Sequence, residues 1–155
     1  MHFLSITEFL FYSWIYFNLF KKQRTRQAIA MIMIIGVVFF LVNVLFIQQP
    51  VNKMFPTNIY LPTEIIFTVF SLMFFKQMLL YPTKVNIARQ SVFWFNTAML
   101  FYATTMFFNL GMTNYFSTQT WSDYIYYFWY VIMYVFHILV AVTILADNKH
   151  ITNAP

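Results

Sequence analysis

The chain has 155 residues, of which 61% are hydrophobic and only 8% charged, and its formal net charge at pH 7 is +5. Soluble globular proteins carry about 25% charged residues, and a water-soluble fold with this composition would expose apolar patches that monomers avoid. Cysteine is absent, which excludes disulfides, thiolate zinc sites and thiol nucleophiles. We therefore expect a single membrane-embedded domain over residues 1–155, solvated by the lipid bilayer.

Five apolar stretches are long enough to cross a bilayer as helices: residues 3–20, 28–47, 61–81, 91–112 and 122–146. A helix satisfies all its backbone groups in lipid, whereas barrel strands would alternate in polarity, which these stretches do not. Pro62 suits the first turn of the third stretch, where a missing N–H costs nothing. The predicted fold is an all-α membrane protein, a bundle of five transmembrane helices.

A basic run at residues 21–26, between the first two stretches, predicts the orientation. Basic loops stay in the cytoplasm, so this run places the N-terminus outside and the C-terminus in the cytoplasm. With that orientation only Lys53 falls on the exterior side, and the other basic residues fall inside: Lys76, Lys84, Arg89 and Lys149. Because the charge lies beside apolar stretches rather than on a polar face, we expect no nucleic-acid partner.

Three acids, Glu8, Glu64 and Asp123, are expected in the first turns of the odd-numbered helices, on the exterior side. They could cap their helices, because Ser5 precedes Glu8 at capping-box spacing and acids complement the helix dipole there. Alternatively they could form an outward cluster for a cation, a proton or a basic ligand. Glu64 and Glu8 are the stronger candidates for a contact, because an acid in an apolar span is costly and tends to have a partner.

The last stretch has the clearest pattern, because six residues recur at intervals of four and three and so share one helix face. They are Asp123, Tyr127, Tyr130, Tyr134, His137 and Ala141. This stripe could line a polar crevice with an ionisable group at its base, or it could be a packing face whose hydroxyls bond neighbouring helices. His137 alone makes no metal or haem site, since His2 and His150 lie at opposite ends, and we expect no cofactor.

The fourth stretch carries Asn96 among threonines in an apolar background, which favours hydrogen bonding between helices and makes Asn96 a candidate polar contact. The sequence has no His-Glu-x-x-His pattern, no nucleophile elbow and no phosphate-binding glycine loop. We therefore expect no enzymatic activity.

Residues 58–66 (NIYLPTEII) and 91–102 (SVFWFNTAMLFY) together resemble stretches of uncharacterised multi-helix inner-membrane proteins of Bacteroidota. The resemblance implies a multi-pass protein of the bacterial inner membrane and a role associated with signalling. It implies no active site.

The functional hypothesis is a non-catalytic membrane protein, a sensor or accessory subunit that binds another membrane protein or a further copy within the bilayer. In this hypothesis Glu64 is the exterior polar contact and His137 the buried ionisable group. The alternative is a small channel or carrier that conducts as an oligomer, with the tyrosines and His137 along a wet path.

Overall fold

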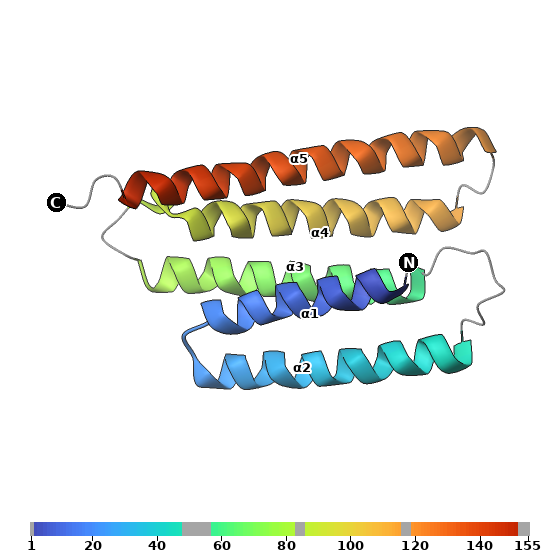
Figure 1. Cartoon of the computed structure of the whole chain (residues 1–155), viewed down its shortest axis with the longest axis horizontal. Coiled ribbons are helices and arrows are strands. Elements are labelled where there is room, and N and C mark those ends of the chain that lie inside the picture. Colours follow the sequence, from blue (N-terminus) through green and yellow to red (C-terminus); the bar gives the residue numbers. More distant parts are fainter. Residues whose placement is uncertain (1, 48–56, 83–85, 116–118, 152–155) are drawn as a thin grey trace. The chain divides into compact units, whose positions relative to one another are not determined.

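The computed structural model describes residues 2–47, 57–82, 86–115 and 119–151. Helices account for 94% of these residues, and no strand occurs among them, so the all-α prediction is confirmed for the described part of the chain. The α-helices are α1 (His2–Leu19), α2 (Gln23–Val42), α3 (Thr57–Leu80), α4 (Ser91–Tyr115) and α5 (Gln119–Ile151), with a π-helix, η1 (Asn43–Ile47), and a 3-10 helix, η2 (Ile87–Arg89) (Figure 1).

Three segments are long and apolar enough to cross a membrane: Gln23–Phe46, Ile59–Leu80 and Tyr127–Ala146. They belong to α2 with η1, to α3 and to α5, and they indicate that the protein associates with a membrane. The described parts of α1 and α4 are not long and apolar enough by the same comparison, because serine, asparagine, threonine and tyrosine interrupt their apolar residues and lower the mean hydropathy.

The helices extend beyond the apolar stretches that predicted them. Helix α2 begins at Gln23 rather than residue 28, α3 at Thr57 rather than residue 61, and α5 covers Gln119–Ile151 rather than residues 122–146. Backbone hydrogen bonding does not stop where hydrophobicity does, so polar flanks continue the helix. The first-turn prediction for Pro62 was therefore wrong: Pro62 lies inside α3 and removes one helix hydrogen bond there.

The chain divides into two compact units, Met1–Thr63 and Glu64–Pro155. In the first unit, α1 and α2 form an antiparallel hairpin (Figure 1). Gly36 of α2 lies against the ring of Phe9, so closely that a Cβ atom at this position would overlap the ring. At the hairpin end, the Arg26 guanidinium stacks over Phe17 at 4.4 Å from the ring centre, a cation–π contact between the two helices.

In the second unit, α4 and α5 run antiparallel and pack along their length (Figure 1). Ala98 and Ala103 of α4 are fully buried, and small residues of this kind let helix backbones approach closely in membranes. Tyr102 and Phe136 join the two helices, with ring centres 4.8 Å apart. Helix α3 is farther from α4, because aromatic side chains such as the pair Phe75–Phe93, with ring centres 5.8 Å apart, lie between them.

The second unit carries its described basic residues at one end. Because α3 and α5 both run antiparallel to α4, the end of α3, the start of α4 and the end of α5 come together there (Figure 1). Lys76 and Arg89 are exposed at this end, and the Trp94 indole N–H donates to the Ala88 carbonyl at 2.9 Å, which fixes η2 against α4. Lys53 and Lys84 lie outside the described residues, as does the side chain of Lys149.

Candidate functional site

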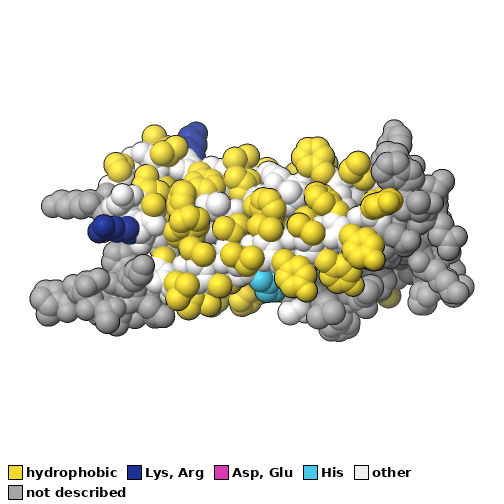
Figure 2. Space-filling model, turned by 90° about the horizontal axis from the view of Figure 1, so that it is seen from above, with side chains coloured by type: hydrophobic (Ala, Val, Ile, Leu, Met, Phe, Trp, Pro, Cys, Tyr) yellow, Lys and Arg dark blue, Asp and Glu magenta, His cyan; other side chains and the backbone are white. Residues whose placement is uncertain are grey.

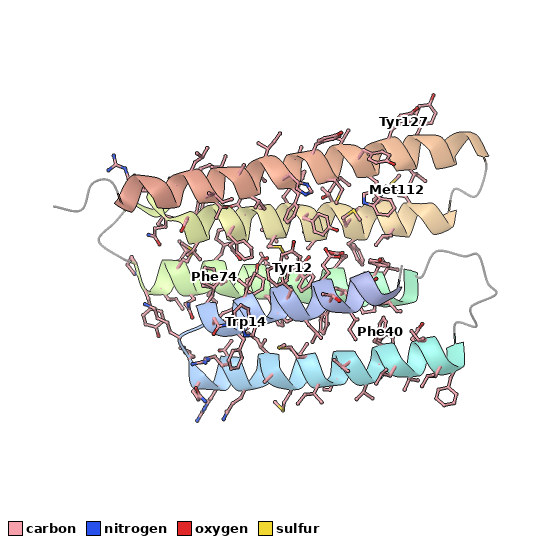
Figure 3. All side chains as sticks on the ribbon, viewed as in Figure 1. Tyr12, Trp14, Phe40, Phe74, Met112 and Tyr127 are labelled. Atoms are coloured by element: carbon pink, nitrogen blue, oxygen red, sulfur yellow. The ribbon has the colours of Figure 1, made fainter. Side chains whose placement is uncertain are left out.

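One face of α5 combines polar groups with high exposure. We define the tyrosine–histidine face as Tyr127, Tyr130, Tyr134, His137 and Ala141. The three tyrosines are 70%, 63% and 72% exposed, and His137 and Ala141 are exposed too. Tyr127 points away from α4 in Figure 3, and Figure 2 shows the single described histidine on the surface among hydrophobic side chains. The predicted stripe is thus a continuous outward face of the helix.

The opposite side of α5 is the side that packs. Ile132 and Phe136 are buried, and Phe136 meets Tyr102 of α4. These two residues lie roughly half a helical turn away from Tyr130 and Tyr134, which explains why one set is buried and the other exposed. The tyrosine–histidine face therefore lines no crevice within the second unit.

The His137 ring on this face is held by a hydrogen bond that selects one tautomer. Its Nδ1 lies 2.6 Å from the carbonyl oxygen of Met133, and because a carbonyl only accepts, Nδ1 carries the proton and donates. In the neutral ring Nε2 is then a hydrogen-bond acceptor. His137 is ten residues beyond Tyr127, the first residue of the apolar segment Tyr127–Ala146, which places it about 15 Å into a hydrocarbon core of about 30 Å.

Glu64 and Asn96 are both buried in the second unit, with Glu64 only 3% exposed and Asn96 fully enclosed. The Asn96 side-chain amide donates to the carbonyl oxygen of Ser71 at 3.1 Å, which ties α4 to α3. Ser71 lies seven residues after Glu64, or about 10 Å along the helix. Glu64 and Ser71, the partner of Asn96, therefore both lie on the buried side of α3, but Glu64 and Asn96 do not form one site. His137 is part of neither contact.

Glu8 and Glu64 do not lie in the first turns in which the spacing placed them. No acid lies in the first turn of α1, α3 or α5, because each helix begins earlier than its apolar stretch. Glu64 is the eighth residue of α3, and Glu8 is half-buried in the second turn of α1. The side chain of Asp123 lies outside the described part of the structure. Among the described residues, no three acids or histidines come together as metal ligands.

The first unit contains buried polar atoms that the sequence patterns did not predict to be buried. The hydroxyls of Ser5 and Ser13 and the Oδ1 of Asn43 are buried, with no hydrogen-bond partner among the described residues. A signal was present, because the two serines lie four residues before and after Phe9 and so share its face of α1.

The described residues thus offer one surface rather than one pocket as the candidate site. Asn96 serves helix packing and Glu64 is enclosed, whereas the tyrosine–histidine face presents hydroxyls and an imidazole outward near the middle of an apolar segment. No protein-family model, curated protein or solved structure matches the chain.

Proposed function

We propose that the protein is a non-catalytic accessory subunit or sensor of the membrane, which binds a partner helix within the bilayer through the tyrosine–histidine face of α5. The observation that carries this proposal is His137, an ionisable group on an outward face near the middle of an apolar span. Ionisable side chains at that depth almost always face a protein interior or a wet cavity, because hydrocarbon offers them no hydrogen bond.

The tyrosines support the same conclusion. Tyrosine is favoured at the membrane interface, where its hydroxyl reaches water, and Tyr127 at the start of the apolar segment fits that role. Tyr134 lies seven residues further on, about 10 Å deeper, and the residue is 72% exposed rather than packed within the unit. A partner helix would cover these groups and offer them hydrogen bonds.

We also propose that all five helices span the bacterial inner membrane, with the N-terminus outside and the C-terminus in the cytoplasm. For α4 the support is the way in which its polar groups are satisfied. The hydroxyls of Thr97 and Thr104 donate to the carbonyls of Phe93 and Leu100, at 2.8 and 2.7 Å, and Asn96 is buried. Polar side chains bonded to their own helix or buried against a neighbour do not oppose insertion as free ones would.

The orientation follows from the loop-charge rule applied to each unit. In the first unit, Lys21, Lys22 and Arg24 are exposed at the turn between α1 and α2. In the second, Lys76 and Arg89 mark the end that also holds the last turns of α5. The resemblance to inner-membrane proteins of Bacteroidota supports the same location.

A photo-crosslinking amino acid placed on the face tests the proposed function. At Tyr130, within the tyrosine–histidine face, we expect a discrete protein adduct when native membranes are illuminated. The control position is Ile35 of α2, which is 65% exposed and purely apolar in its surroundings, so it should give no such adduct. Adducts of equal yield from both positions, or none from Tyr130, would reject the proposal.

A small channel or carrier remains the second candidate, since hydroxyls and an imidazole could line a wet path. Because the tyrosine–histidine face points outward from the second unit, such a path would need to form between several copies. Solute or proton flux into proteoliposomes that falls when His137 is replaced by Leu would favour this candidate.

A further inference from the structure

The tyrosine–histidine face continues a repeat that is typical of paired helices. Between Tyr127 and Ile144, six of the exposed positions recur in steps of three and four residues, which is the heptad spacing of positions a and d: Tyr127, Tyr130, Tyr134, His137, Ala141 and Ile144. An average period of 3.5 residues keeps one seam turned toward a second helix over many turns.

The seam lies on the side of α5 that its own unit leaves open. The residues that pack against α4, Ile132 and Phe136, occupy positions f and c of the same repeat, opposite the seam. Helix α5 therefore has one face that packs within the unit and an opposite face that is exposed.

The polar groups along the seam complement a second identical seam. Each tyrosine hydroxyl can donate and accept, while His137, with its Nδ1 proton bonded to Met133, offers Nε2 as an acceptor. A second copy inserted with the same orientation brings the same groups to the same depth of the bilayer. In a parallel pair, the Tyr134 hydroxyl of one copy then lies one turn from His137 of the other, and donors meet acceptors without any other protein.

We propose that the tyrosine–histidine face is the seam of a parallel homodimer, in which the α5 helices of two copies pack in the same register. This inference rests on the proposed function and names the partner as a second copy of this chain. The helices approach most closely at Ala141, since small residues allow close contact of backbones, and stand farther apart at the tyrosines.

Cysteine cross-linking tests the dimer cleanly, because the chain has no native cysteine and a single introduced thiol can pair only with another molecule. We expect Ala141→Cys and Ile144→Cys, in native membranes under mild oxidation, to form disulfide dimers at least fivefold faster than Phe128→Cys. Phe128 is a matched control because it is also exposed, at 48%, but lies off the seam. Equal rates at the three positions would overturn the proposal.

The contribution of the polar groups is tested in the Ala141→Cys background. His137→Leu and Tyr134→Phe each remove one hydrogen-bonding group from the seam, and we expect either change to slow disulfide formation at least threefold. Neither side chain packs within the unit, so the far-ultraviolet circular dichroism spectrum should stay unchanged. An unchanged rate with both variants would overturn the proposed pairing.

The two proposals fail in different ways. If the probe at Tyr130 captures a different protein while Ala141→Cys forms no dimer, the homodimer is wrong and the proposed function stands. If neither experiment gives a protein adduct, both are wrong.

Discussion

Asn96 is the polar residue whose role the structure defines most fully, because its amide joins α4 to the Ser71 carbonyl of α3 in a fully buried position. We expect Asn96→Ala to lower the free energy of unfolding by about 0.6 to 1.7 kcal/mol, the average and the maximum for interhelical hydrogen bonds in a membrane protein. Titration with sodium dodecyl sulfate in mixed micelles, followed by circular dichroism, measures this change.

Asn18 provides the matched control for that experiment. Its amide donates to the Trp14 carbonyl of its own helix at 2.8 Å, and the side chain is exposed. Asn18→Ala should leave the free energy of unfolding nearly unchanged. A loss as large as that of Asn96→Ala would show that the α3–α4 hydrogen bond is not the source of the effect.

Ser13 should respond in the opposite sense. Its hydroxyl is buried with no partner among the described residues, and an unsatisfied buried polar group costs about 1 to 3 kcal/mol. We expect Ser13→Ala to leave the stability unchanged or to raise it, as measured by the same detergent titration. Clear destabilisation would mean that the hydroxyl has a partner, such as an ordered water molecule, and would contradict this interpretation.

At the scale of the helix, the two glycines of the chain make a matched pair. A methyl group at Gly36 would overlap the Phe9 ring between α1 and α2, whereas one at Gly111 of α4 would meet no atom within 4 Å. We expect Gly36→Ala to destabilise the protein by about 1 to 3 kcal/mol through overpacking. Gly111→Ala should stabilise it by up to about 1 kcal/mol, because alanine favours the helix.

The free energy of unfolding is measured for both variants, and the sign of its change tests the prediction. Phe40 lies on the side of α2 that faces α1, further along the same packing surface (Figure 3). If Phe9 can turn aside at little cost, Gly36→Ala will also stabilise the protein, and the close approach of α1 and α2 will not be a determinant of the hairpin.

The positions of the helices could be predicted from the sequence. The residues at which they begin, and which face of α5 packs and which is exposed, could not. Continuous apolar runs located the five helices, but α3 begins at Thr57, so Pro62 and Glu64 lie in its interior rather than in its first turn. On α5 the spacing placed Tyr134 and His137 on one face. It did not reveal that the face points outward, because within a membrane either the polar face or the apolar face with Ile132 could have packed on α4.

At the scale of the whole molecule, the number of membrane spans determines which loops lie on which side of the bilayer. Helices α2, α3 and α5 meet the length and hydropathy of a membrane span, while α1 and α4 do not. Three and five spans both place the chain termini on opposite sides of the membrane. Locating the termini alone therefore does not distinguish three spans from five. Positions at the two ends of α1 and of α4 do distinguish them.

Single cysteines at these ends give the decisive pattern with a maleimide that does not cross membranes. If all five helices span, His2→Cys and Thr118→Cys react in intact spheroplasts, while Lys22→Cys and Asn86→Cys react only after the membrane is permeabilised. Labelling of every variant after permeabilisation is the control. If α4 does not span the bilayer, Asn86→Cys and Thr118→Cys show the same labelling. If α1 does not span the bilayer, His2→Cys and Lys22→Cys show the same labelling. In the five-span pattern the exposed Arg89, three residues after Asn86, lies in the cytoplasm as the loop-charge rule requires.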